Sequence, residues 1–268
     1  MSVFVAKGKD AIKSVSFLHK ALLPIVNRYR RRGGESERIR QYCATAPAVI
    51  PQPMFVKVGA NDGIFDDPIS DVLLAGGKWR GLLIEPLPIF FDRLRKNFGD
   101  GEKYILEQIA IGAKAGKAPF YYVDPKAIDS IPGRPAWPLG LGSFSRDLIM
   151  NHLDGVLAPF IIECTVEVRP LSEVLKEHGI REVHLLHIDA EGHDFEVLKT
   201  IDLANQAPAA ILLEHKHLSD VHKSELLGHL RKHGYRVDDS GGDFFAIHRR
   251  SPLSRLARDW AGRARHSA

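Results

Sequence analysis

Short, nearly continuous apolar runs alternate along the chain with stretches whose apolar residues recur at a helical period. The runs that we predict as buried strands are 54–60, 80–86, 104–112, 183–190 and 209–216. The stretches that we predict as helices are 67–76, 88–98, 170–179, 193–203 and 219–233. Such an alternation predicts an α/β fold, in which a doubly wound, mostly parallel sheet is covered by helices on both faces.

The end of the chain departs from this alternation. Residues 235–249, YRVDDSGGDFFAIHR, contain two short apolar runs joined by DSGGD, which predicts an antiparallel hairpin. The five parallel strands and this C-terminal antiparallel hairpin together predict a seven-stranded sheet.

Residues 113–168 fit the alternation least well. Two predicted strands, 118–124 and 161–169, flank a segment rich in proline, glycine and aromatic residues. A long irregular segment in a compact domain is usually a lid or a binding loop, and here it would sit beside the ligand crevice of the sheet. We therefore predict a lid-like insertion at about 124–160, with a cover for a sheet edge as the alternative.

Charge is distributed unevenly over the 268 residues. The net charge is +7 for residues 1–40 and +5 for 249–268, which leaves −8 for the body of the chain. We expect a basic N-terminal extension, helical or partly disordered, at 1–50, one folded domain at 51–249, and a basic tail at 250–268. An acidic body argues against a nucleic-acid groove through the fold.

Residues 14–32 resemble a basic amphipathic helix that could contact an anionic membrane surface or a partner, although a solvated extension is the alternative. No apolar run is long enough to cross a bilayer, and lysines interrupt any secretion signal. Cys43 and Cys164 belong to no ligand pattern, which favours reduced thiols. We expect a cytoplasmic protein, with peripheral contact at the inner face of a membrane left open.

The first predicted strand ends in the turn VGANDG at 58–63, where Gly59 and Gly63 permit close backbone approach. The turn contains Asp62, and an acidic turn suits a cationic ligand better than a phosphate. Glu85 ends the second predicted strand, where a carboxylate can accept hydrogen bonds from both hydroxyls of a ribose. NAD enzymes use the same arrangement, so Glu85 alone does not identify the cofactor. We interpret Asp66 and Asp67 as an exposed helix start.

The fourth predicted strand leads into HIDAEGHDFEVL, which carries Asp189, Glu191 and His193 in five consecutive positions. His193 is a candidate general base, and Asp189 could orient an acceptor or bind a cation. A helix start is the alternative explanation for Glu191. We interpret His187 as a buried, hydrogen-bonded histidine.

The fifth predicted strand ends at Glu214 and His215. Together with Asp189 these residues could bind Mg²⁺, since adjacent strand ends meet at one edge of a parallel sheet. One alternative is that Glu214 and His215 bind substrate hydroxyls directly, and a weaker one is a zinc site formed by His215 and His217.

Seven blocks, in order, resemble the FkbM-type methyltransferases, which use S-adenosylmethionine (SAM) and mostly methylate hydroxyl groups. They are VGANDG (58–63), GLLIEPLPIFFDRL (81–94), QIAIG (108–112), GLGSFS (140–145), LLHIDAEGHDFEVLKT (185–200), ILLEHKHL (211–218) and GYRVDDSGGDFFAI (234–247). The resemblance implies the Rossmann-like class I methyltransferase fold over about 55–248.

The resemblance also implies roles for single residues. Gly59, Asn61 and Gly63 would line the methionine part of SAM, and Glu85 would hold its ribose. Asp62, in the same turn, either contacts SAM or only shapes the turn. Gln108 and Ala110 would lie beside the adenine, and Asp189, Glu191 and His193 would act at the methyl group.

We therefore expect SAM-dependent O-methylation of a sugar, glycan or other polyhydroxylated small molecule, with Mg²⁺ as a possible second cofactor. Three alternatives stay open at this point. They are an NAD-dependent oxidoreductase, a nucleic-acid N-methyltransferase, and a binding protein without activity. The sequence DAEG at 189–192 differs from the (N/D/S)PP(Y/F/W) loop that N-methyltransferases often carry there.

Overall fold

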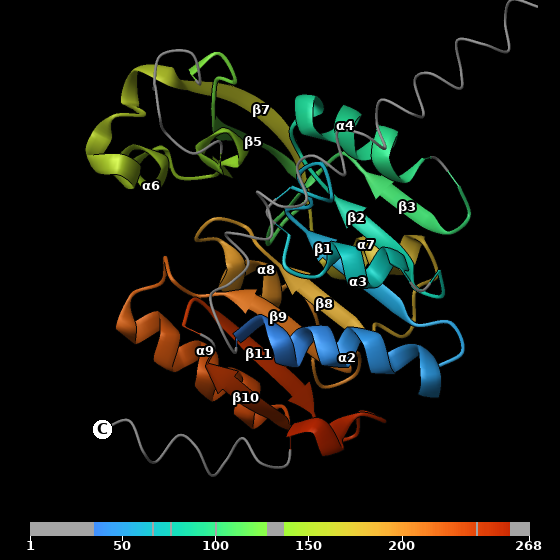
Figure 1. The fold of residues 1–268 in the computed structure, drawn as a ribbon. Helices are drawn as coiled ribbons and strands as arrows, with labels where there is room; N and C mark the ends of the chain where they lie inside the picture. The colour runs from blue at the N-terminus through green and yellow to red at the C-terminus, as the bar shows by residue number, and fades with distance from the viewer. Residues whose placement is uncertain are drawn as a thin grey trace, which may run out of the picture.

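The computed structural model describes residues 35–65, 67–75, 77–99, 101–127, 137–239 and 241–257. The basic helix expected at 14–32 lies outside these residues, as does most of the C-terminal tail. Figure 1 shows the chain as an α/β protein built around one large sheet.

The large sheet has seven strands in the order β10-β11-β9-β8-β1-β2-β3. Only β11 runs against the others, because it pairs antiparallel with both β9 and β10. The predicted parallel sheet with its C-terminal hairpin is therefore confirmed. The bounds are β1 Met54–Val58, β2 Arg80–Ile84, β3 Tyr104–Glu107, β8 Leu185–Ile188, β9 Ala210–Glu214, β10 Tyr235–Asp239 and β11 Asp243–His248.

Helices cover both faces of this sheet. Successive side chains of a strand point to opposite faces, and the strands are apolar on both, so both faces need a covering layer. In β2, Leu82 and Ile84 pack with one layer of helices, and Leu83 packs with the other. The first layer contains α7 (Leu171–Glu177), α8 (Asp194–Lys199) and α9 (Asp220–Lys232). The second contains α2 (Glu35–Val49), α3 (Ser70–Ala75) and α4 (Pro88–Phe98).

Helix α2 differs from the expectation of an N-terminal extension up to residue 50. Its buried residues Ile39, Tyr42, Cys43 and Ala46 follow a helical spacing and pack against the sheet. The Tyr42 hydroxyl donates to the His184 carbonyl at 2.7 Å, and its ring meets Phe245 edge to face. The basic charge of the N-terminal segment suggested an extension, but α2 is an amphipathic helix that belongs to the folded domain.

A second sheet, in the order β4-β7-β5-β6, corrects the single strand expected at 104–112. Its bounds are β4 Ala110–Ile111, β5 Gly116–Val123, β6 Gly142–Ser143 and β7 Ile161–Arg169. Pairing of β3 with β2 ends at the hydrogen bond from the Glu85 backbone N–H to the Glu107 carbonyl. Pro86 has no backbone N–H that could continue the pairing. Ala110 and Ile111 pair with β7 instead.

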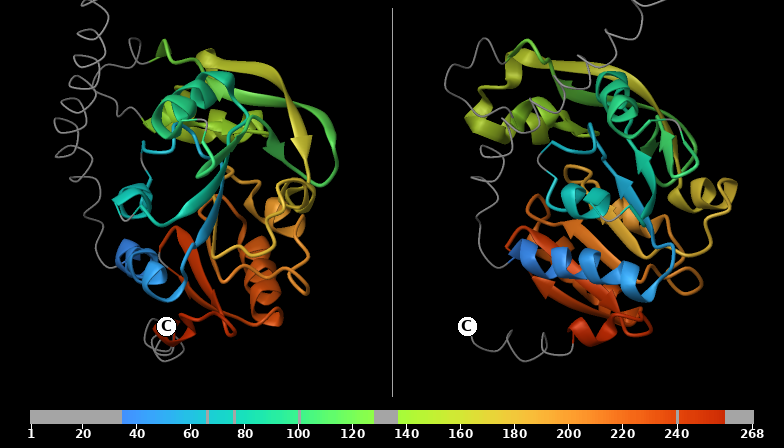
Figure 2. Two further views of the ribbon diagram at one scale, coloured as in Figure 1. Left: turned by 90° about the vertical axis from the view of Figure 1, so that its right-hand side faces the viewer. Right: turned by 45° about the vertical axis from the view of Figure 1, so that its right-hand side comes forward.

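Within the described residues, the expected insertion between β5 and β7 contains the short strand β6 and four short helices. The helices are η1 (Trp137–Gly140), α6 (Arg146–Asn151), η2 (His152–Gly155) and η3 (Ala158–Phe160). Leu141, Ile149 and Leu157 form a small core of their own with Val123 and Ala127. Figures 1 and 2 show this insertion with β5 and β7 at one end of the molecule, remote from β10 and α9. Among the described helices, none combines the length and apolar character needed to cross a bilayer.

Candidate functional site

A cavity lies beyond the carboxyl ends of β1, β2 and β8, where these strands face the insertion. Ligands of open α/β sheets bind at this edge. The lining includes Gly59, Asn61, Glu85, Ile109, Ala110, Gly140, Gly142, Phe144, Asp189, Glu191 and Lys216. The strand ends and the insertion therefore form one site.

The loop after β1 is held against both neighbours of that strand. Gly59 has φ +75°, and a Cβ there would lie 1.8 Å from the Asp189 carbonyl oxygen. Only glycine fits this close approach. Asn61, also left-handed at φ 51°, donates from Nδ2 to the Gly140 carbonyl at 3.3 Å. This contact joins the first loop to the insertion.

Asp62 and Gly63 shape the turn and do not line the cavity. Asp62 Oδ1 accepts from the backbone N–H groups of Ile64 and Phe65 at 2.9 and 2.7 Å. A Cβ on Gly63 would lie 2.2 Å from the Phe98 ring, so this glycine lets α4 pack closely. The first helix described after this loop is α3, which begins at Ser70, so among the described residues no helix N-terminus directly follows the glycines.

Glu85 is buried at the end of β2 with its carboxylate fixed by two backbone donors. Asn61 N donates to Oε2 at 2.8 Å and Leu87 N donates to Oε1 at 2.9 Å. Burial raises the pKa of this carboxyl to about 7, although both hydrogen bonds oppose the rise. Each oxygen keeps a further lone pair for a ligand hydroxyl.

The part of the cavity lined by Asp189 and Glu191 is acidic. Burial raises the pKa values of both carboxyls; repulsion from Glu214 adds to the rise at Asp189, and repulsion from Asp189 adds to the rise at Glu191. Burial also raises the pKa of Glu214, which pairs with Lys216. Glu191 has a left-handed backbone at φ 45°, which is rare for a non-glycine residue and typical of functional sites.

His193 stands just outside the lining as the N-cap residue of α8. Its ring centroid lies 4.7 Å from that of Phe144, which does line the cavity. Burial lowers the pKa of His193. Gln108, expected beside an adenine, is exposed, and Ile109 and Ala110 line the cavity in its place.

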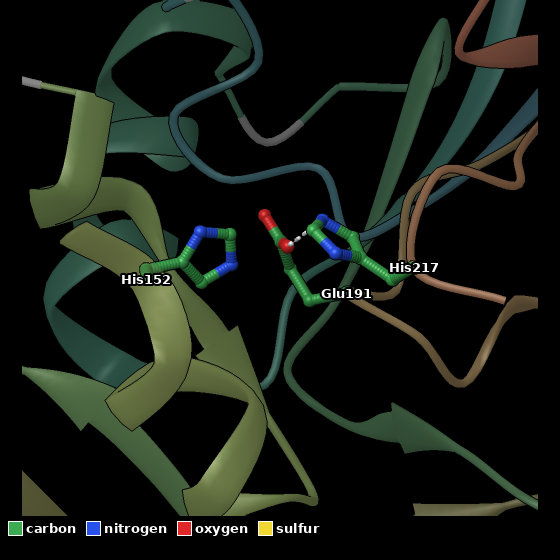
Figure 3. Close-up of side chains that lie close together, drawn as sticks. All are labelled: His152, Glu191 and His217. Carbon is green, nitrogen blue, oxygen red and sulfur yellow. Dashed lines mark ion pairs between the residues drawn. The ribbon is translucent and has the colours of Figure 1, made fainter. Parts of the chain in front are cut away.

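The expected metal ligands Asp189, Glu214 and His215 do not converge. Adjacent residues of extended chain point to opposite faces, so Glu214 and His215 diverge. His215 Nε2 lies 3.0 Å from Asp239 Oδ1, and its ring stacks on Phe244 at 3.9 Å. Among the described residues, the group that brings three potential ligand atoms within 4.8 Å of one another is His152, Glu191 and His217 (Figure 3).

A charged cluster in the cavity lining, made by Lys57, Asp67 and His187, corrects two further expectations. Asp67 caps α3 as expected of a helix start, accepting from Ile69 N and Ser70 N, but it is buried and paired with Lys57. Although burial opposes it, Lys57 and then His187 lower the pKa of Asp67. His187 is buried, yet its Nδ1 has no hydrogen-bond partner and lies 3.9 Å from Asp67 Oδ2. Asp66 lies outside the described residues.

The sequence interpretation missed Lys57, Lys216 and His152, and it named His217 only as a partner of His215 in a zinc site. A lysine inside the apolar run MFVKV was a usable signal for Lys57, because an inward lysine needs a buried partner. No local signal marks His152, which reaches the site only through the fold of the insertion.

A family model described as the methyltransferase FkbM domain matches residues 57–237, which is most of the chain. The chain belongs to the FkbM methyltransferase family. The match runs from β1 through β10 and so includes the whole cavity and the insertion.

Among curated proteins, methyltransferase sdnD from Sordaria araneosa is 24% identical over 191 residues, which cover 62% of this chain and 67% of sdnD. A solved FkbM methyltransferase from Methylobacillus flagellatus KT is 14% identical with a TM-score of 0.44. That match covers 74% of this chain but only 43% of the other. A precorrin-6y C5,15-methyltransferase from Geobacter metallireducens GS-15 is 10% identical with a TM-score of 0.36, covering 78% and 85% of the two chains.

In this FkbM methyltransferase, the cavity is lined by some of the predicted cofactor-binding residues and by some of the predicted catalytic residues. Gly59, Asn61, Glu85 and Ala110 of the predicted cofactor residues line it, whereas Asp62, Gly63 and Gln108 do not. Of the predicted catalytic residues, Asp189 and Glu191 line it and His193 does not.

Proposed function

We propose that this methyltransferase uses SAM and methylates a hydroxyl group of a sugar, glycan or other polyhydroxylated small molecule. The observation that carries the cofactor assignment is Glu85. Its buried carboxylate faces the cavity at the end of β2, oriented by Asn61 N and Leu87 N. When bound there, SAM would supply a methyl group activated by a sulfonium cation.

The site fits a nucleoside without phosphates better than a dinucleotide. A pyrophosphate is usually bound at a helix N-terminus directly after the first strand, but α3 starts only at Ser70. Among the described residues that line the cavity, the basic side chains are Lys57 and Lys216, and each is paired with a carboxylate. These features favour SAM over NAD.

The acidic side supports a hydroxyl acceptor. An aliphatic hydroxyl needs a group that draws its proton away as the new C–O bond forms. The Asp189 carboxylate lies at the end of β8, beside the close approach of Gly59, and lines the cavity. We assign Asp189 as the residue that orients the acceptor and accepts its proton, with Glu191 beside it; His193 keeps the alternative role of base.

Titration with S-adenosylhomocysteine and with NAD, followed by thermal unfolding, tests the cofactor. We expect S-adenosylhomocysteine to raise the melting temperature and NAD to leave it unchanged; stabilisation by NAD alone would overturn the assignment. Transfer of labelled methyl from SAM to a panel of glycans and small alcohols tests the acceptor class. Labelling of nucleic acid but of no hydroxyl compound would replace it.

We expect the affinity for S-adenosylhomocysteine to fall as the pH falls through about 7, because the Glu85 carboxyl titrates there. Its pKa is raised, so the acceptor form predominates only above that pH, and protonation removes an acceptor for the ribose hydroxyls. Well below pH 7 the affinity should fall by about tenfold per pH unit. Calorimetry between pH 5.5 and 8.5 measures this.

The Glu85→Gln variant is the matched control, since it keeps size and polarity but cannot ionise. At high pH it should bind roughly 10- to 100-fold more weakly than the wild type, as expected for lost charge-assisted hydrogen bonds. Its pH dependence then reports only the ligand's own titration. Identical pH profiles for the two proteins would contradict the role of Glu85.

A further inference from the structure

We propose that His152, Glu191 and His217 bind a divalent transition-metal ion of the zinc class, which fastens the insertion to the carboxyl edge of the sheet. The three residues come from different segments. His152 directly follows α6 in the insertion, Glu191 follows β8, and His217 follows β9. Figure 3 shows the Glu191 carboxylate between the two imidazole rings.

The donor atoms of Glu191 and His217 have the spacing expected in a coordination shell. His217 Nε2 lies 3.4 Å from Glu191 Oε2, and neither atom has a hydrogen-bond partner although both are buried. Ligand atoms bound about 2.0–2.1 Å from a tetrahedral Zn²⁺ lie roughly 3.4 Å apart. All three potential ligand atoms fall within 4.8 Å of one another. An ion between them would satisfy buried polar atoms that are otherwise costly.

The ligand types select the metal. Two imidazoles and one carboxylate suit Zn²⁺ or a similar transition metal, whereas Mg²⁺ prefers oxygen ligands and water. Three protein ligands leave a fourth position open.

Packing around the cluster shows what the ion would hold. Ser143 Oγ, in the insertion, donates to the Glu191 carbonyl at 2.9 Å. A Cβ on Gly192 would lie 2.5 Å from Leu148 of α6, so this glycine lets the insertion approach the strand end closely. The insertion already contacts the sheet beside Glu191, and a bound ion would add a bond from His152 to both strand ends.

The test uses the full chain, stripped with EDTA and titrated with Zn²⁺ alone and with Mg²⁺ alone. We expect the wild type to bind one Zn²⁺ tightly and Mg²⁺ far more weakly. His152→Ala and His217→Ala should each weaken Zn²⁺ binding by about 100-fold or more. The control is His222→Ala, an exposed histidine of α9, which should bind as the wild type does. Equal Zn²⁺ affinity in the wild type and both cluster variants would overturn the site.

Hydrogen exchange tests the fastening separately. Zn²⁺ should slow amide exchange over 146–155 in the wild type and in His222→Ala, and have no effect in His152→Ala. Tight binding through the cluster without slower exchange would overturn the fastening role. Circular dichroism checks folding, and His217→Gln, which keeps a polar side chain, replaces any alanine variant that fails to fold.

Discussion

Replacing Asp189 with asparagine is expected to lower the rate of methyl transfer by about 10²- to 10⁴-fold, the range for loss of a positioned acid–base group. Asp189 directly follows β8 and lines the cavity. Asparagine keeps the shape of the side chain but cannot accept the acceptor's proton. Affinity for S-adenosylhomocysteine should change little, because the proposed ribose contacts are made by Glu85.

Two measurements separate catalysis from binding in this variant. Single-turnover transfer from labelled SAM reports the chemical step, and calorimetry with S-adenosylhomocysteine reports binding. His193→Ala is the comparison, since its ring packs on Phe144 just outside the lining. We expect a smaller loss there. A larger loss in His193→Ala than in Asp189→Asn would assign the base to His193, and full turnover in Asp189→Asn would remove Asp189 from the mechanism.

Replacing Lys57 with methionine is expected to destabilise the fold by about 3–5 kcal/mol, because it leaves the buried Asp67 carboxylate without its main counter-charge. Asp67 would then remain buried either as a charge without its lysine counter-ion or by taking up a proton. Chemical denaturation measures the change in the free energy of unfolding.

A second substitution tests that explanation. Asp67→Asn in the Lys57→Met background removes the orphaned charge while keeping Oδ1, which accepts from Ile69 N and Ser70 N. The double variant should recover much of the lost stability. Lys117→Met, at an exposed position of β5, is the matched control and should change stability by less than about 0.5 kcal/mol. A loss under 1 kcal/mol in Lys57→Met would contradict a structural role for the pair.

Much of the fold was predictable because its elements are locally encoded. Helix α4 and strand β7 begin and end where the sequence pattern predicts, since proline, glycine and a regular period mark their ends. The antiparallel direction of β11 was predictable from the turn between the two short apolar runs that form β10 and β11. The packing of helix α2 into the folded domain was missed, because the charge of the N-terminal segment obscured its apolar stripe.

The candidate site was predictable where a residue follows a strand directly. Gly59, Glu85 and Asp189 each lie at the carboxyl end of a parallel strand, and these ends meet at one edge whatever the loops between them do. Asp62 was harder to assign, because its contacts with Ile64 N and Phe65 N depend on the exact turn. Sequence position identified the edge but not which side chains face it.

The sequence by itself determined the order of strands and helices, the carboxyl edge as the site, and the carboxylates that surround it. Periodicity and strand ends are local properties, so they can be read from neighbouring residues. Only the tertiary structure decided that Lys57 meets Asp67, that His215 turns to Asp239, and that His152 approaches Glu191 and His217. These contacts join residues from separate segments, and their geometry depends on how the insertion packs against the sheet.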